Sequence, residues 1–234
     1  MKTDFPHLDS VHGWLNTQAL IFTSLYRTKF LQNIEFSCLE IGVHHGKFFI
    51  GLENLTPRNG KAIAIDVFES QDKNIDGSGS GNLEIFHQHV SNFCQNPKRV
   101  IARSLDSLDI DVSEIGFNQF GLVSIDGGHT ANHTMHDLDT SSKLVTETGL
   151  VILDDILNQD WTGVVTGAVN YFTSSKGSRI VPFAIGYNKL FCCHYTMRNR
   201  VMKHLVESRD ELKKYNIQVF KLTEFAGNQV ISLK

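Results

Sequence analysis

The hydrophobic residues of the chain alternate between continuous apolar runs, typical of buried strands, and runs at helical spacing. Apolar positions over residues 14–30 recur at helical spacing and predict an amphipathic helix that opens the fold. Apolar runs then predict strands at residues 36–42, 61–67, 99–103, 120–126, 149–155, 180–185 and 189–195. Helical patterns between and after them cover residues 45–54, 83–93, 131–145, 163–173 and 199–214.

Repeated strand-helix units of this length predict an α/β fold of the Rossmann-like, doubly wound type. We expect a mostly parallel sheet of about seven strands with helices on both faces. The pattern predicts one domain over residues 1–234, with a helical cap at 1–34, the core at 35–196 and a helix-strand extension at 197–234. Ligands of such sheets bind at the carboxyl ends of the strands, so polar residues there are the candidate site.

The composition is that of an ordinary globular protein, with 234 residues, 41% hydrophobic and 20% charged. A net charge of -3 and the absence of basic blocks disfavour a nucleic-acid partner. No apolar run has the length of a membrane span, and residues 1–10 lack a secretion signal, so we expect a cytoplasmic protein that binds no membrane. The four cysteines lack C-x-x-C spacing and are expected to be reduced.

A strand-to-helix turn contains Gly42 and Gly46, where backbone N–H groups can approach a ligand closely. The spacing is one residue short of a P-loop, and Lys47 is followed by no hydroxyl for Mg²⁺. The middle glycine of a dinucleotide-binding loop is also missing, which disfavours a nicotinamide-dependent oxidoreductase. His44 and His45 within this turn face either the ligand or solvent.

The pattern E-x-G-x-x-x-G, from Glu40 to Gly46, resembles the first motif of class I S-adenosylmethionine-dependent methyltransferases. The resemblance implies that Glu40, Gly42 and Gly46 hold the aminocarboxypropyl end of S-adenosylmethionine. Asp66 ends the next strand, where an acid can accept hydrogen bonds from both ribose hydroxyls. Ser104 matches the position at which this family contacts adenine.

A glycine- and serine-rich loop at residues 69–82 has no apolar anchors. Such a segment is either an active-site flap or a disordered insertion, and the sequence does not separate the two.

Carboxylates end two further strands, Asp126 after one and Asp154 with Asp155 after the other. Because adjacent strands lie about 4.8 Å apart, these three acids can share one cation, and hard oxygen donors favour Mg²⁺ or another divalent ion. Alternatively the acids cap the following helices, or Asp126 contacts the cofactor. His133 and His136 lack a zinc-binding pattern and are interpreted as solvated helix residues.

His129 follows Asp126 after two glycines, and a neutral imidazole is suited to removing a hydroxyl proton. Over residues 13–195 this pattern resembles the metal-dependent small-molecule O-methyltransferases, a group that includes macrolide-sugar O-methyltransferases and cephalosporin-hydroxylase-like relatives. The resemblance implies that His129 is the general base. It also matches Trp161 to a family tryptophan that either walls the acceptor pocket or pins a loop.

These patterns together predict metal-assisted O-methylation of a small-molecule hydroxyl, with S-adenosylmethionine as donor and His129 as base. Two alternatives stay open, a metal-independent methyltransferase and a non-catalytic module that binds S-adenosylmethionine or a nucleoside. The acceptor has no readable signature, and a sugar, a phenol or a polyketide hydroxyl are all compatible. The first helix and the C-terminal strands offer surfaces for a homo-oligomer.

Overall fold

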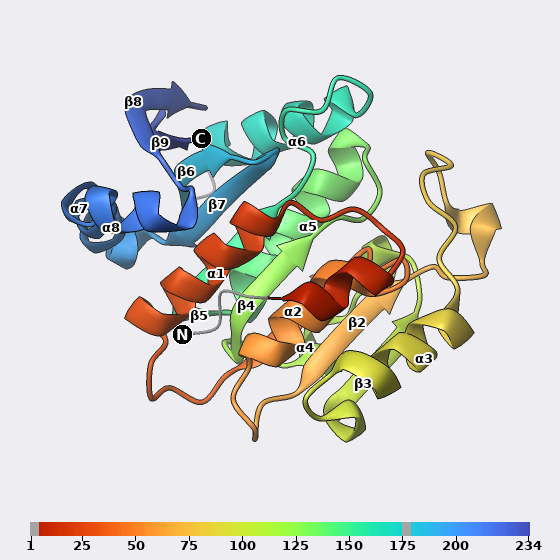
Figure 1. The fold of residues 1–234 in the computed structure, drawn as a ribbon. Helices are drawn as coiled ribbons and strands as arrows, with labels where there is room; N and C mark the ends of the chain where they lie inside the picture. The colour runs from red at the N-terminus through yellow and green to blue at the C-terminus, as the bar shows by residue number, and fades with distance from the viewer. Residues whose placement is uncertain (1–4, 175–178) are drawn as a thin grey trace.

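One continuous sheet organises the computed structural model, which describes residues 5–174 and 179–234 (Figure 1). The strands run in the order β3-β2-β1-β4-β5-β7-β6-β9-β8. Their bounds are β1 Ser37–Ile41, β2 Ala62–Asp66, β3 Val100–Ser104, β4 Phe120–Ile125, β5 Val145–Leu153, β6 Ile180–Gly186, β7 Lys189–His194, β8 Val219–Phe225 and β9 Asn228–Leu233. The first five are parallel, whereas β7 runs antiparallel to both β5 and β6.

Helices cover both faces of the sheet (Figure 1). The α-helices are α1 Thr17–Phe30, α2 Lys47–Leu55, α3 Leu83–Phe93, α4 Val112–Ile115, α5 Ala131–Leu144, α6 Thr162–Thr173, α7 Arg198–Glu207 and α8 Arg209–Leu212. Short 3₁₀ helices occupy Pro6–Ser10, Gln71–Lys73, Pro97–Arg99, Ser107–Asp109, Tyr195–Met197 and Lys213–Tyr215. Apolar residues of α1, α2, α3 and α7 pack on one face, and those of α4, α5 and α6 on the other.

Burial on both faces explains the continuous apolar runs of the central strands. Along β1, Cys38 packs into the core under α1 and α2, while Leu39 packs into the core under α5 and α6. All five residues of β1 and all six of β4 are buried. Because successive side chains point to opposite faces, such a strand must be apolar at nearly every position. Glu40 is therefore an exception that requires a separate explanation.

The strand order reverses direction between β1 and β4. From β1 the chain proceeds to β2 and β3 on one side, and β4 and β5 lie on the other. At such a point the loops after neighbouring strands separate and leave a crevice at the carboxyl edge of the sheet. The glycine turn after β1 and the Asp126 segment after β4 both lie at this edge.

The predicted elements are confirmed with shifts at their ends, except that the single helix predicted over residues 199–214 is two α-helices, α7 and α8, followed by a 3₁₀ turn. The first helix begins at Thr17 rather than residue 14, because the Asn16 side chain accepts a 3.2 Å hydrogen bond from the N–H of Ala19 and caps it. Within the described residues the sheet has nine strands rather than about seven, because β9 pairs with β6 and brings β8 with it. No helix among the described residues has the length and apolar character needed to cross a membrane.

A buried ion pair joins α2 to the start of β3. Arg99 Nε lies 2.7 Å from Glu53 Oε1, and the two side chains are 7% and 0% exposed. Glu53 also accepts hydrogen bonds from the backbone N–H groups of Gln95 and Asn96. Since every charge at this junction is satisfied internally, removing one partner would leave the other buried and uncompensated.

We predict that Arg99→Leu lowers the free energy of unfolding by about 3–5 kcal/mol, because it leaves Glu53 as an unpaired buried carboxylate. The matched control is Arg103→Leu, whose partner Glu114 is 64% exposed and whose loss should cost less than about 1 kcal/mol. Urea unfolding of both variants measures the two values. Equal destabilisation would contradict the assignment of a structural role to the buried pair.

Candidate active site

A cavity of about 990 Å³ opens at the carboxyl edge of the sheet. It is lined by the segments after β1, β2, β3, β4 and β5, by the Gly-Ser loop, by residues 13–16 before α1, and by Tyr187, Asn188 and Lys189 at the β6–β7 turn. The crevice at the strand-order reversal is therefore the candidate site, and its volume suits a cofactor together with a small second ligand.

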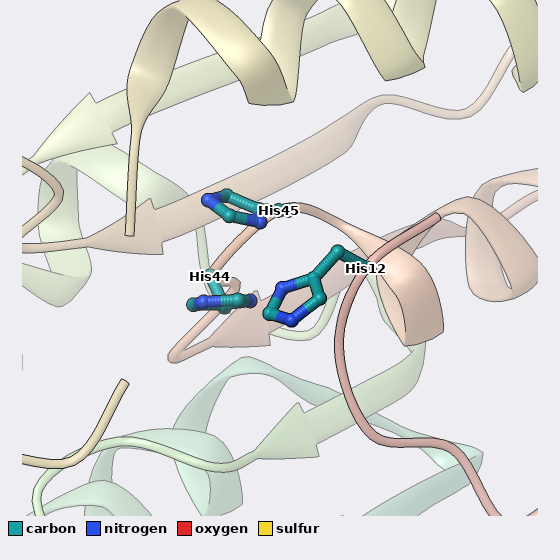
Figure 2. Close-up of side chains that lie close together, drawn as sticks. All are labelled: His12, His44 and His45. Atoms are coloured by element: carbon teal, nitrogen blue, oxygen red, sulfur yellow. The ribbon is translucent and has the colours of Figure 1, made fainter. Parts of the chain in front are cut away.

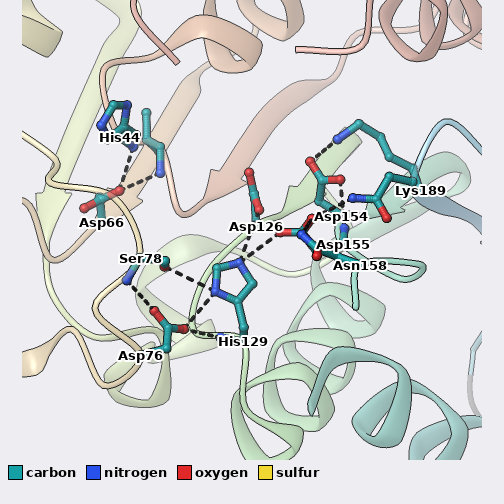
Figure 3. Close-up of polar contacts among 12 residues, drawn as sticks. His44, Asp66, Asp76, Ser78, Asp126, His129, Asp154, Asp155, Asn158 and Lys189 are labelled. Atoms are coloured by element: carbon teal, nitrogen blue, oxygen red, sulfur yellow. Dashed lines mark hydrogen bonds and ion pairs between the residues drawn. The ribbon is translucent and has the colours of Figure 1, made fainter. Parts of the chain in front are cut away.

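The glycine turn after β1 is held in place by Asp66. Asp66 Oδ2 accepts 2.7 Å hydrogen bonds from the N–H groups of both Val43 and His44 (Figure 3). Its Oδ1 accepts a hydrogen bond from the N–H of Phe68. His44 has a φ of 52°, an uncommon backbone conformation for a non-glycine residue, and Asp66 stabilises it. Asp66 lines the cavity, and most of its acceptor capacity already serves the protein backbone.

Gly42 is required by close packing rather than by ligand access alone. Its φ is 80°, and a Cβ at this position would lie 1.7 Å from the carbonyl oxygen of Asp126. Gly46, with a φ of 91°, is the N-terminal cap of α2 and lies against the ring of Phe86. Close contacts therefore explain why both positions are glycine. The turn also brings the end of β1 into contact with the end of β4.

Glu40 lies in a small pocket next to the main cavity, together with Lys47 and Asp126. It is only 2% exposed, and its Oε2 atom has no hydrogen-bond partner. Burial, and then the nearby Asp126 carboxylate, hold the pKa of Glu40 well above its usual range. Lys47 donates from Nζ to the carbonyl of Gly13 at 3.2 Å, which ties the N-terminal segment to the start of α2.

The segment after β3 places Asp106 and Ser107, rather than Ser104, on the cavity wall. Ser104 is the last residue of β3, and its hydroxyl donates to the carbonyl of Val67 at 3.3 Å. His133 is buried and joins this wall, with Nε2 lying 3.3 Å from Asp106 Oδ1. The interpretation of His133 as a solvated residue is thus wrong, because α5 turns it toward the segment after β3.

Asp126, His129 and Asp155 form one cluster, with candidate ligand atoms all within 4.8 Å of one another. His129 Nε2 lies 3.1 Å from Asp155 Oδ2 and 3.8 Å from Asp126 Oδ1. Asp155 Oδ1 also accepts hydrogen bonds from the side-chain amides of Asn158 and Asn188. The strands after which these residues lie are neighbours, as predicted, and they bring two of the three predicted acids together.

Asp154 takes a different partner from the one predicted. Its Oδ2 pairs with the ammonium of Lys189, at the start of the adjacent strand β7 (Figure 3). Lys189 is only 4% exposed. Burial lowers the pKa of Lys189, but Asp154 and then Asp126 outweigh it and raise the pKa above its usual value. The third member of the candidate ligand cluster is therefore His129 and not Asp154.

The Gly-Ser loop reaches His129. Asp76 Oδ2 accepts hydrogen bonds from the backbone N–H of His129 at 2.7 Å and from its Nδ1 at 2.8 Å. Ser78 Oγ lies 3.2 Å from the same Nδ1, and its backbone N–H donates to Asp76 Oδ1. Figure 3 shows His129 between this loop and the Asp126–Asp155 side. The loop is thus part of the cavity wall, which matches a flap better than an insertion without function.

Trp161 stacks on the imidazole of His129. The ring centroids are 4.5 Å apart and the planes are inclined by only 16°. Trp161 also lines the cavity, so it both walls the site and fixes the orientation of His129. With Asp76 on Nδ1 and Trp161 against one ring face, the imidazole is fixed with Nε2 toward Asp126 and Asp155.

The charges around His129 are strongly coupled. Burial lowers the pKa of His129, but the Asp126 and Asp155 carboxylates outweigh it and raise the pKa to about 10. Withdrawal from bulk water, followed by repulsion from Asp154, raises the pKa of Asp126 to about 7. Protons are therefore retained where negative charge is in excess, which is also where a cation binds most favourably.

Sequence patterns missed Asp76, Lys189, Lys47 and the Asp106–Ser107 pair. A lysine at the start of the apolar run Leu190–Cys193 was a usable signal, because a charged residue in a buried strand needs a buried partner. Asp76 had no such signal, since only the folded loop brings it to His129 across 53 positions of sequence.

The order of the parallel strands, the glycine turn at the reversal point and the cavity above it define a doubly wound α/β fold, in which ligands bind at this point. Residues 39–156, about half of the chain, match the family described as a methyltransferase domain. The chain therefore belongs to this family, and it is an S-adenosylmethionine-dependent methyltransferase. No curated protein sequence is detectably similar to it.

Solved structures share the fold at low sequence identity. The O-methyltransferase NovP is 14% identical, with a TM-score of 0.64 over 78% of this chain and 82% of that one. A putative O-methyltransferase from Klebsiella pneumoniae is 16% identical, with a TM-score of 0.58 over 81% and 89%. The O-methyltransferase from Bacillus cereus in complex with SAH is 18% identical, with a TM-score of 0.56 over 77% and 81%.

We predict that His129 in the metal-free protein stays protonated at neutral pH and titrates near pH 10. Because this pKa exceeds that of the unfolded chain, the charged imidazole stabilises the fold fully below about pH 6.5, and this contribution fades as the pH rises through the folded-state pKa. Asp76→Asn should lower the pKa by removing a neighbouring carboxylate. Imidazole NMR measures both values, with His204, whose pKa is lowered by burial, as the internal control. Titration of His129 near its usual pKa would contradict this electrostatic assignment.

Proposed function

We propose that the protein transfers a methyl group from S-adenosylmethionine to the hydroxyl of a small molecule, with His129 as general base. The observation that carries the proposal is the fixed orientation of the His129 imidazole. Asp76 fixes Nδ1, and Nε2 faces the carboxylates of Asp126 and Asp155 inside the cavity beside the glycine turn. The methyltransferase family and the O-methyltransferases of the same fold support oxygen as the acceptor atom.

The residues of the glycine turn suit the charged end of S-adenosylmethionine. Glu40 Oε2 is buried without a partner, so it is available to pair with the cofactor ammonium group. Lys47, at the first turn of α2, is placed to pair with the cofactor carboxylate, as is the helix N-terminus. The cofactor itself supplies an electrophilic methyl group.

We expect the ribose and adenine of S-adenosylmethionine to lie along the carboxyl ends of β2 and β3. A carboxylate offers about four acceptor positions, and Asp66 uses three of them for backbone N–H groups, so capacity remains for a ribose hydroxyl. We assign the adenine contact to Asp106 and Ser107, because they line the cavity and Ser104 does not.

Proton removal by His129 follows from its partners. An acid hydrogen-bonded to Nδ1 holds the tautomer in which Nε2 is free to accept a proton and stabilises the imidazolium that forms. Asp76 is the positioning residue here, because it contacts His129 and not the reacting atoms. His129 gives up its own proton more readily once the charges of Asp126 and Asp155 are neutralised by a ligand.

Asp126, Asp155 and His129 also fit a divalent cation better than the three predicted acids. They offer two carboxylates and one imidazole within 4.8 Å, whereas Asp154 is neutralised by Lys189. This donor set suits Mg²⁺ or Mn²⁺, and such an ion would make an acceptor hydroxyl more acidic. We propose Asp126 and Asp155 as its principal ligands, because His129 is also needed as the base.

The aromatic and apolar part of the cavity wall is suited to the acceptor. Trp161 and Tyr187 line the cavity, as do Trp14 and Ile75, which are 77% and 66% exposed. Exposed apolar side chains around a cavity mouth are available to cover a ligand. A small molecule with a flat or apolar face beside its hydroxyl matches this wall.

We predict that His129→Gln lowers kcat by about 10²- to 10⁴-fold while S-adenosylmethionine still binds, because the base is lost and the glycine turn is intact. Release of S-adenosylhomocysteine with sugar, phenol and polyketide-alcohol acceptors measures the rate, and calorimetry measures binding. Asp160→Asn, an exposed acid one residue before Trp161, is the control and should retain activity. Unchanged turnover in His129→Gln would reject the base, and no cofactor binding by the wild type would reject the function.

Removal of divalent ions by a chelator should abolish most of the methyl transfer, and added Mg²⁺ should restore it, because the Asp126–Asp155 pair would then lack its cation. Asp155→Asn should weaken the response to Mg²⁺. The same S-adenosylhomocysteine assay measures both effects. Full activity in the presence of chelator would instead support the metal-independent methyltransferase.

A further inference from the structure

A second cluster of potential metal ligands lies on the glycine turn, beside the small pocket that contains Glu40 and Lys47. It consists of His12, His44 and His45, whose imidazole nitrogens include a set within 4.8 Å of one another (Figure 2). His44 and His45 belong to the glycine turn, and His12 belongs to the segment that precedes α1. The proposed reaction uses none of these three side chains.

Figure 2 shows the rings of His44 and His45 one above the other, with the ring of His12 beside them. The ring centroids of His12 lie 5.5 Å from those of His44 and His45, and the latter two are 3.8 Å apart. Like-charged imidazolium groups at these separations would repel one another. The neutral imidazole is also the form that binds metal ions.

Two nitrogens of the cluster are buried without a partner. They are Nδ1 of His44 and Nδ1 of His45. A buried polar atom in a native protein normally has a hydrogen-bond partner or a ligand, so two such atoms in adjacent residues need an explanation. Burial, and next the neighbouring histidines, lower the pKa of His44 to about 4, which leaves its ring unprotonated at neutral pH.

The backbone holds this arrangement in place before any ligand binds. Asp66 fixes the N–H of His44 in its uncommon conformation, with a φ of 52°. Lys47 donates to the carbonyl of Gly13 and so holds the residue next to His12 over the turn. Ligands fixed on two separate segments give a site that loses little entropy on binding.

We propose that His12, His44 and His45 form a binding site for a transition-metal ion of the Zn²⁺ class. Three imidazoles with one open position suit Zn²⁺, whereas Mg²⁺ prefers oxygen donors. The site is thus chemically distinct from the Asp126–Asp155 pair. A bound ion would join the segment before α1 to the glycine turn and so strengthen one side of the cofactor cavity.

The test is calorimetric titration of the metal-free protein with Zn²⁺. We expect His12→Gln to lose one equivalent of bound Zn²⁺ and to retain any equivalent bound at the carboxylates. Asp155→Asn should show the reverse, losing the carboxylate equivalent and keeping the histidine one. His12 is exposed, so its variant should fold like the wild type, and circular dichroism checks this.

The matched control is His87→Gln, an exposed histidine on α3 outside the cluster, which should bind Zn²⁺ like the wild type. Co²⁺ provides an independent readout, because its visible absorption reports imidazole coordination. We expect that absorption in the wild type and in Asp155→Asn, and its loss in His12→Gln. Identical Zn²⁺ binding by His12→Gln and the wild type, or no Zn²⁺ binding sensitive to His12, would overturn the proposal whether or not the protein methylates a hydroxyl.

Discussion

The close approach of β1 and β4 at their carboxyl ends is the constraint on which the site depends. At Gly42 any side chain would collide with the Asp126 carbonyl, so only glycine lets the turn after β1 cross the end of β4. This contact places the glycine turn and the Asp126–His129 segment on the same cavity. The proposed methyl donor and the proposed base are neighbours because two backbones touch.

Charge balance governs the chemistry of the cavity. Glu40, Asp126, Asp154 and Asp155 converge on one edge of the sheet, and within the described part of the chain Lys189 is the buried ammonium that faces them. Lys189 pairs with Asp154 directly, and the carboxylates of Asp126 and Asp155 raise the pKa of His129. The same excess of negative charge that raises the pKa of His129 is what would attract a divalent ion.

The glycine turn joins two groups of side chains that share one pocket. Glu40, at the end of β1, lies in the small pocket proposed for the charged end of the cofactor. His12 and His44 line the same pocket and meet His45 in the proposed metal cluster. Asp66 supports both groups, because its carboxylate fixes the backbone of Val43 and His44. A ligand bound to either group would therefore stabilise the geometry of the other.

The sequence by itself determined the strands and helices, the glycine turn and the segments that carry Asp126, His129 and Asp155. These are local patterns, since burial on both faces requires continuous apolar runs and a sharp turn requires glycine. Only the tertiary structure decided which charges pair. Asp154 forms an ion pair with Lys189 on β7, and Asp76 from a loop distant in sequence binds His129. Asp106 and Ser107 line the part of the cavity where Ser104 was expected. Such choices depend on distances between segments remote in sequence, and no local pattern encodes them.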